Sequence, residues 1–265
     1  MSETGSGIST DYNAGRSVRS PLRGCFVPLA LGVVGFVVVH PMDLRIFEAL
    51  RGLEARLPSD LRREWFAWQQ YGQGVAIGFT ALLLWTLAPR LRRRLLDLGL
   101  AVAAAQAVST IGKMLVGRPR PRPDFMDPGT FLGPFGVYPI RVADQWRLVH
   151  AWETSRGAGA DLWSMPSSHA LFAAMFSAFL ASILPAAGWL FVLAAIVVGL
   201  ARVVFGAHWP SDVVVGWAVG YAIGSTITRN GLGVRLLDRI WIRFVDRAAK
   251  PAWPVLRAAS PPPRR

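Results

Sequence analysis

The sequence predicts an all-α membrane protein, built as a bundle of six transmembrane helices. Hydrophobic residues make up 52% of the 265 residues and charged residues only 17%, whereas about 25% are charged in a typical soluble domain. Six apolar stretches come close to the length of about 20 residues that spans the hydrocarbon core of a bilayer. They cover residues 22–40, 71–89, 95–116, 168–187, 188–207 and 212–229.

The first stretch could be either the apolar part of a signal peptide or an uncleaved helix. It follows Arg16, Arg19 and Arg23, as a signal peptide would. No small-x-small cleavage pattern comes after it, only His40-Pro41-Met42-Asp43, so we predict an uncleaved first helix. The fifth stretch contains Arg202 and the sixth is short, which leaves the limits of these two the least defined.

The distribution of arginine predicts how the helices are oriented. The formal net charge is +13 and comes almost entirely from arginines between the apolar stretches, which favours an anionic bilayer surface over nucleic acid as partner. Four arginines within residues 90–94 separate the second and third helices, and such a short basic loop marks the cytoplasmic side. With six spans the basic C-terminal residues fall on that side too, and residues 118–167 open to the opposite face.

These features divide the chain into three parts. Residues 1–20 are polar and contain several Gly and Ser residues, which predicts a disordered cytoplasmic N-terminus. Residues 21–230 form the six-helix membrane domain, in which residues 118–167 are a long active-site loop. Residues 231–265 are predicted to be a basic, amphipathic cytoplasmic tail.

Two stretches outside the six spans carry apolar residues at helical spacing, namely 44–57 and 234–248. Each suits a helix lying on the bilayer surface and equally a helix packed against the bundle. The segment between Pro121 and Pro166 is long for a loop and rich in aromatic residues, so we expect it to cover the site. Apolar side chains over 142–149 predict a short surface helix within it.

The first of three polar motifs lies at the end of the third helix. Lys113 is followed by alternating Arg and Pro from Arg118 to Pro123, a run that must leave the helix because Pro lacks a backbone N–H. Alternate side chains of an extended run share a face, so Arg118, Arg120 and Arg122 are expected to line one surface. Alternatively, Lys113 snorkels to the membrane surface and the arginines contact lipid headgroups.

The second and third motifs add histidines and a carboxylate. Pro166-Ser167-Ser168-His169 precedes the fourth helix, where free backbone N–H groups and the helix dipole favour an anion. Arg202 lies six residues before His208, and Asp212 lies four after it. A carboxylate that accepts the proton of one imidazole nitrogen leaves the other nitrogen free to attack. We therefore expect Asp212 to hold His208, and the three motifs to form one phosphate pocket.

The remaining histidines and the cysteine suggest structural roles. His40 follows the first helix and His150 lies in the long loop, both outside the three motifs. The single cysteine, Cys25, excludes an intrachain disulfide and a Cys-based zinc cluster. At the head of an apolar stretch it is expected to be a small core residue.

The pattern Lys-x6-Arg-Pro, Pro-Ser-x-His and Arg-x5-His-x3-Asp, over residues 113–212, resembles the signature motifs of the type 2 phosphatidic acid phosphatase superfamily. The six-helix outline is similar to the membrane branch of that superfamily. Two positions depart from the usual pattern, since Ser168 stands where glycine is usual and Ala201 where serine precedes the arginine. Neither change removes a catalytic group.

The resemblance implies a role for each motif residue. His208 would be the nucleophile that forms a phosphohistidine, Asp212 would orient it, and His169 would protonate the leaving oxygen and later activate water. The phosphoryl oxygens would be bound by Lys113, Arg120, Ser167, Ser168 and Arg202. Arginine and lysine donors match phosphate without a metal ion, so we expect neither metal nor cofactor.

The expected function is that of an integral membrane phosphatase acting on a lipid phosphomonoester or diphosphate. Polyprenyl diphosphate, phosphatidic acid and phosphatidylglycerol phosphate all fit, in a bacterial inner membrane with the site facing the periplasm or exterior. A lipid phosphotransferase would use the same site with a second acceptor in place of water. A transporter would instead have ionisable groups facing one another at mid-bilayer, and a vanadium haloperoxidase is disfavoured by six spans. The sequence does not predict the oligomeric state.

Overall fold

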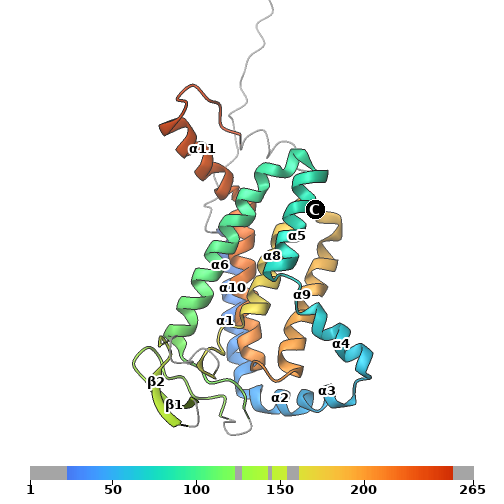
Figure 1. Ribbon diagram of the computed structural model, residues 1–265, viewed down its shortest axis with the longest axis vertical. Coiled ribbons are helices and arrows are strands. Elements are labelled where there is room, and N and C mark those ends of the chain that lie inside the picture. Colours follow the sequence, from blue (N-terminus) through green and yellow to red (C-terminus); the bar gives the residue numbers. More distant parts are fainter. Residues whose placement is uncertain (1–22, 123–126, 143–144, 154–160, 253–265) are drawn as a thin grey trace, which may run out of the picture.

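The computed structural model describes residues 23–122, 127–142, 145–153 and 161–252. Most of them lie in α-helices that run along the long axis of the molecule (Figure 1). The predictions for residues 1–20 and for the last part of the tail fall outside the described residues.

Each of the six apolar stretches contains a helix. These are α1 (Arg23–Val39), α5 (Gly74–Leu87), α6 (Leu95–Val116), α8 (Ser168–Ile183), α9 (Gly188–Val204) and α10 (Pro210–Asn230). Three described helical segments are long and apolar enough to cross a membrane, namely Cys25–Arg56, Pro89–Val116 and Pro185–Val204. Because α5 and α8 are apolar but shorter, and α10 carries several polar residues, the count of six spans stays a prediction.

Glycines on α10 let it approach α8 closely. A β-carbon at Gly216 would lie 2.7 Å from the carbonyl oxygen of Ser167, and one at Gly220 only 2.0 Å from that of Leu171. The same four-residue spacing continues to Gly224. Small residues at this spacing allow two helix backbones to touch, so the N-terminal turn of α8 is held against the first turns of α10.

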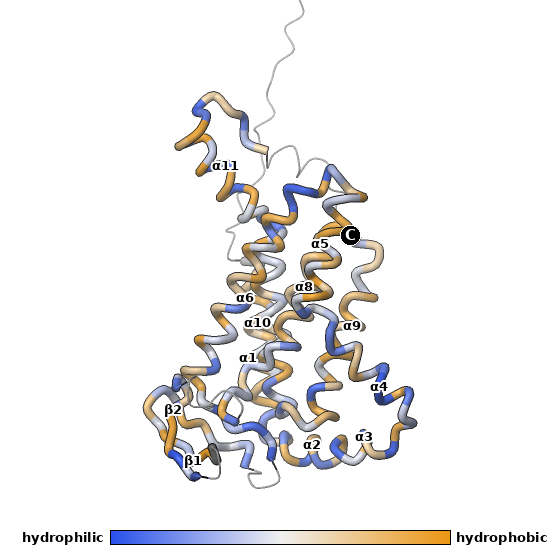
Figure 2. Tube along the Cα trace, in the orientation of Figure 1, coloured by the Kyte–Doolittle hydropathy of each residue, from blue (hydrophilic) through white to orange (hydrophobic). Residues whose placement is uncertain are grey.

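The apolar core lies between α6, α8 and α10, whereas the outer helices present apolar side chains outward. Leu171, Met175 and Phe179 are fully buried in that core. Large apolar side chains such as Val33 on α1 and Phe79 on α5 are exposed, which suits contact with lipid better than contact with water. Figure 2 shows hydrophobic residues along the bundle and hydrophilic ones towards its ends.

Short helices lie at both ends of the bundle. At the lower end of Figure 1 lie α2 (Asp43–Arg51), α3 (Leu53–Arg56) and α4 (Ser59–Trp68). The helical spacing over 44–57 thus corresponds to helices, and α2 packs on the bundle, because the Phe47 ring lies 5.3 Å from that of Trp209. At the other end α11 (Leu232–Phe244) projects from the bundle (Figure 1).

The prediction of a short surface helix over 142–149 is wrong, because this segment belongs to an antiparallel hairpin. Strand β1 (Val137–Val142) pairs with β2 (Gln145–His150). Val149 is fully buried, whereas Trp146 is exposed, and β-branched and aromatic residues fit a half-buried sheet. The apolar residues Val142, Trp146 and Val149 have helical spacing, but the pairing of β1 with β2 makes the segment extended instead. The fold is therefore mostly helical with one small hairpin rather than purely all-α.

Candidate active site

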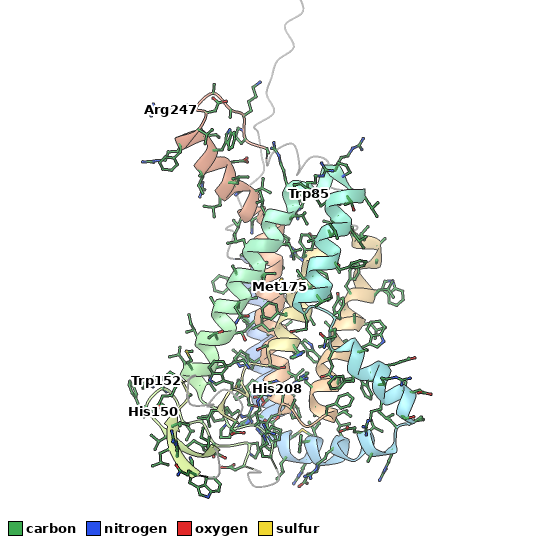
Figure 3. All side chains as sticks on the ribbon, in the orientation of Figure 1. Trp85, His150, Trp152, Met175, His208 and Arg247 are labelled. Carbon is green, nitrogen blue, oxygen red and sulfur yellow. The ribbon has the colours of Figure 1, made fainter. Side chains whose placement is uncertain are left out.

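The three predicted motifs converge at the lower end of the bundle, near α2 and the hairpin. Lys113 lies in the last turn of α6 and His169 in the first turn of α8. Arg202 lies near the end of α9, and Asp212 lies in the first turn of α10. Figure 3 shows His208 at this end, in the connection between α9 and α10.

The chain leaves α6 through a sharp turn that directs the first motif across the site. Gly117 has a φ of +55°, and a β-carbon there would lie 2.9 Å from the carbonyl oxygen of Gly133. Both features favour glycine. The backbone of Arg118 then pairs with Ser164 (3.1 Å) and that of Arg120 with Asp161 (2.8 Å), which brings the first motif alongside the residues that precede the second.

Arg118, Arg120 and Arg122 do not line one surface, contrary to the expectation for an extended run. Arg118 is fully buried because two carboxylates bind its guanidinium inside the protein. Arg122 is exposed and lies 3.4 Å from Asp161. Of the three, Arg120 is half-buried, and it donates to the carbonyl oxygen of Ala207 at 3.0 Å.

Three cations from separate elements, namely Lys113, Arg120 and Arg202, lie close enough to His208 to lower its pKa. Lys113 donates to the carbonyl oxygen of Trp163 at 2.8 Å, and Arg202 donates to the side-chain oxygen of Gln69. Within the described ranges the Nε atoms of Arg120 and Arg202 are buried without a hydrogen-bond partner.

Ser167 contributes a further unsatisfied group to the same site. Its Oγ is also buried and has no partner among the described residues. An unsatisfied buried group costs about 1–3 kcal/mol, and an oxyanion is an acceptor that suits each of these three donors. No three described His, Cys, Asp or Glu side chains lie close enough together to hold a metal ion.

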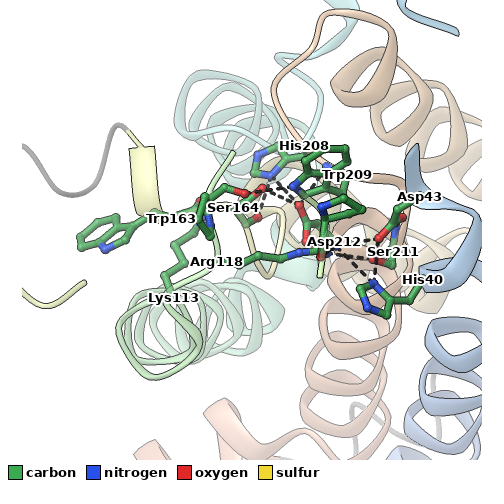
Figure 4. Close-up of polar contacts among 12 residues, drawn as sticks. His40, Asp43, Lys113, Arg118, Trp163, Ser164, His208, Trp209, Ser211 and Asp212 are labelled. Atoms are coloured by element: carbon green, nitrogen blue, oxygen red, sulfur yellow. Dashed lines mark hydrogen bonds and ion pairs between the residues drawn. The ribbon is translucent and has the colours of Figure 1, made fainter. Parts of the chain in front are cut away.

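His208 is held in one tautomer by the backbone. Its Nδ1 lies 2.7 Å from the carbonyl oxygen of Ser164 (Figure 4), and because that oxygen can only accept, Nδ1 must carry the proton and Nε2 the lone pair. Burial, together with the charges of Arg120, Lys113 and Arg202, holds the pKa of His208 well below 6.5. The imidazole is therefore neutral at neutral pH, as a nucleophile requires.

Asp212 supports His208 through Ser164 rather than by the direct hydrogen bond expected from the sequence. Its Oδ2 lies 3.8 Å from Nδ1 of His208, too far for a hydrogen bond. Instead Oδ2 accepts from Ser164 Oγ at 2.5 Å and from the backbone N–H of Trp209 at 2.9 Å. Ser164 thus links the carboxylate to the imidazole, and the sequence carried no signal for this residue.

The N-terminal turn of α8 uses its two serines differently. The backbone N–H of Ser167 donates to the carbonyl oxygen of Asp212 at 3.1 Å. The hydroxyl of Ser168, the residue in the usual glycine position, lies 2.9 Å from that of Ser109 on α6. Ser168 can therefore offer phosphate its backbone N–H, at the positive end of the helix, while its side chain binds α6. His169 is half-buried at the same turn.

The structure adds residues that the motifs did not reveal. Asp43 on α2 is fully buried and pairs with Arg118, and His40 lies beside both, 3.0 Å from Asp43. Gln69, buried at the end of α4, holds Arg202. A carboxylate directly after an apolar span is a sign of function, so Asp43 alone had a sequence signal.

Comparison with known protein families matches residues 94–231, slightly more than half of the chain, to the family model described as the PAP2 superfamily. The matched segment includes all three motifs and the helices from α6 to α10, but not α1 to α5. No curated protein and no solved structure matches the chain.

Proposed function

The chain belongs to the PAP2 superfamily, and from this premise we propose that it is an integral membrane phosphatase that dephosphorylates lipids through a phosphohistidine. Members of this superfamily are generally phosphatases, and the long apolar helices indicate a membrane protein. The substrate would be a lipid phosphomonoester or diphosphate. The single observation that carries the proposal is the buried, neutral His208, with its Nδ1 proton committed to Ser164 and three cations close by.

In the first half-reaction the phosphoryl group would bind to Lys113, Arg120 and Arg202, which neutralise its oxygens. Nε2 of His208 attacks phosphorus, and the bond from phosphorus to the leaving oxygen breaks. His169 donates a proton to that oxygen, so the dephosphorylated lipid leaves as a neutral alcohol or, from a diphosphate, as a monophosphate. The positive charge that develops on the imidazole is stabilised by the Ser164 carbonyl and, behind it, by Asp212.

In the second half-reaction water attacks the phosphohistidine. His169, now neutral, accepts the proton of the water, and the phosphorus–nitrogen bond breaks. Inorganic phosphate leaves, and both histidines return to their starting states. The lone pair on Nε2 is restored because Nδ1 keeps its proton throughout, bound to Ser164.

The site would face the periplasm or exterior of a bacterial inner membrane. The arginine-rich turn η2 (Pro89–Arg94) lies at the end of the bundle opposite His208 (Figures 1 and 3). Short basic segments mark the cytoplasmic side, so the opposite end is the exterior one. A lipid phosphate in the outer leaflet would then reach the pocket from the side of the bilayer.

The test is release of inorganic phosphate by the purified protein in detergent from a panel of lipid phosphates. We expect release from at least one lipid monoester or diphosphate, persisting in a chelator, together with an acid-labile phosphoenzyme. Folded protein that releases no phosphate from any of the panel would contradict the proposal. Transfer of phosphate to a second lipid would identify a phosphotransferase, and activity lost in chelator and restored by magnesium would contradict a metal-free mechanism.

A further inference from the structure

A buried network of alternating charges runs from α2 to the nucleophile. The guanidinium of Arg118 lies between two fully buried carboxylates, 2.7 Å from Asp43 and 2.5 Å from Asp212 (Figure 4). Asp43 lies outside the segment that matches the PAP2 superfamily. The family motifs therefore contain one end of this network, Asp212, and not the other, Asp43.

Arg118 is fixed by more than its two ion pairs. It also donates to the carbonyl oxygen of Pro128 at 2.7 Å and to Ser211 Oγ at 2.9 Å. Ser211 in turn donates to both oxygens of Asp43, from its backbone N–H at 2.8 Å and from its hydroxyl at 2.5 Å. His40 completes the surroundings of Asp43, so both terminal nitrogens of the guanidinium have a set direction.

This charge network determines which partner each oxygen of Asp212 binds. Oδ1 is bound by Arg118, while Oδ2 accepts from Ser164 Oγ. Ser164 holds Nδ1–H of His208 with its carbonyl oxygen. Without Arg118, Asp212 could rotate and take up Nδ1 directly, because Oδ2 is already within 3.8 Å of it.

We propose that Asp43 and Arg118 are positioning residues for the nucleophile. They hold Asp212 on Ser164, and so keep Nδ1–H of His208 on the Ser164 carbonyl and the His208 ring in its plane. The consequence for catalysis rests on the proposed function. The consequence for the orientation of His208 and for the partner of its Nδ1–H does not, and it can be measured without turnover.

The kinetic test compares a buried ion pair with an exposed one. Asp43→Asn and Arg118→Gln should each lower kcat on the order of 100-fold, the usual effect of a small misplacement of a reacting group. KM should change little, because Lys113, Arg120 and Arg202 remain in place. Arg118→Lys should recover part of kcat, since it keeps the charge but lacks the planar fork.

The matched controls for the kinetic test are Asp60→Asn and Arg63→Gln. They break an ion pair of 3.0 Å on α4 in which both side chains are 81% exposed. Turnover should not change in either control. A fall in kcat for Asp43→Asn or Arg118→Gln that only matches the loss of folded protein would overturn the proposal.

The second test reads the imidazole directly, by nitrogen NMR of histidine-labelled protein in detergent. The chain has four histidines, so each signal can be assigned by single substitution. We expect Nδ1 of His208 to carry its proton in both proteins, bound to the Ser164 carbonyl in the unaltered protein and to the Asp212 carboxylate in Arg118→Gln, so the signals of Nδ1 and of its proton should shift. Unchanged Nδ1–H signals of His208 in Arg118→Gln would overturn the proposal, whether or not the protein hydrolyses any lipid phosphate.

Two features keep this inference separate from the proposed function. Unaltered protein that is inactive on every lipid would contradict the function alone, while the NMR comparison would still decide the role of Arg118. If Arg118→Gln does not fold, Ser211→Ala replaces it, because that change keeps every charge and removes only one hydroxyl. Ser211→Ala should lower kcat by less than Arg118→Gln does. If neither kcat nor the His208 signal changes, the proposal is overturned.

Discussion

The two ends of the bundle both bury arginine, but they use it in opposite ways. At the end near η2, Arg94 and Asp97 form a 2.9 Å ion pair, and Arg94 also donates to a hydroxyl on α8 and a carbonyl oxygen on α10. Asp97 accepts the first backbone N–H groups of α11. At the other end, within the described residues, Lys113, Arg120 and Arg202 have no carboxylate in ion-pair contact.

The difference separates a structural charge cluster from a binding one. A buried cation with a carboxylate and backbone partners is satisfied and joins elements together. Several cations that contact only neutral oxygens and retain unsatisfied donors repel one another until an anion binds. Arg118, at the same end, belongs to the first kind by its charge, since Asp43 and Asp212 neutralise it, although its Nε has no hydrogen-bond partner among the described residues.

The largest expected effect comes from removing the nucleophile. His208→Ala should lower kcat by at least about 10⁴-fold, on the scale seen when a triad function is lost, and should eliminate the acid-labile phosphoenzyme. The matched control is His150→Ala in the hairpin, where the ring contacts a backbone carbonyl away from the site. Full activity in His208→Ala would mean that another group attacks phosphorus.

The proposed acid should show an effect that depends on the leaving group. His169→Ala should slow release of a lipid alkoxide by roughly 100-fold, the usual scale of general acid catalysis. A substrate with a low-pKa leaving group needs no proton, so its rate should fall much less. The two rates, measured on one preparation, give the comparison, and phosphate trapped on His169 would reverse the assigned roles.

Arg120 and Arg122 lie in the same segment, but their substitution should affect vanadate inhibition differently. Arg120→Ala should weaken vanadate inhibition by about 10- to 100-fold, as expected for a charge-assisted hydrogen bond of about 1.5–3 kcal/mol. Arg122→Ala removes an exposed arginine whose surface pair is worth little, so inhibition should hardly change. Equal effects of the two substitutions would contradict the pocket described here.

The pH dependence should reflect the lowered pKa of His208. A nucleophile with a pKa well below 6.5 stays unprotonated at mildly acidic pH. Formation of the phosphoenzyme from a substrate with a low-pKa leaving group should therefore stay constant between about pH 6 and pH 7. Stopped-flow measurement of that step tests this, and a decline centred near pH 6.5 would show an unperturbed histidine.

The smallest effect on turnover is expected from the structural cluster. Asp97→Asn leaves Arg94 buried without its carboxylate, which should lower the free energy of unfolding by about 3–5 kcal/mol. The turnover of the molecules that remain folded should not change, because the cluster lies at the other end of the bundle. Thermal unfolding in detergent and kcat per folded molecule measure the two quantities separately.

The sequence predicted the helices well because their signals are local. Apolar stretches and motif spacing are read within a few residues, and each of the six stretches contains a helix. The hairpin was missed because Trp146 and Val149 are three residues apart, a helical spacing, whereas in β2 they lie on opposite faces of the strand. Membrane crossing by all six helices depends on more than length and composition, and it stays a prediction.

The site was predicted only in part, because local spacing does not reveal contacts between distant segments. Motif spacing predicted which residues would meet, and their chemical roles remain proposals. Spacing could not show that Asp212 contacts Ser164 instead of His208, nor that Arg118 turns inward, because these contacts join segments dozens of residues apart. Only the packing of α2 and α10 around Arg118 decides between a surface arginine and a buried one.

The family-matched segment does not contain every contact of the candidate site. A chain that began at residue 94 would keep all three motifs, yet Arg118 would lose Asp43 and Arg202 would lose Gln69. One guanidinium would then be buried beside a single carboxylate, and the other would no longer be held in a set direction. The short helices α2 and α4 therefore bring Asp43 and Gln69 to the candidate site from a part of the chain that has no recognised motif.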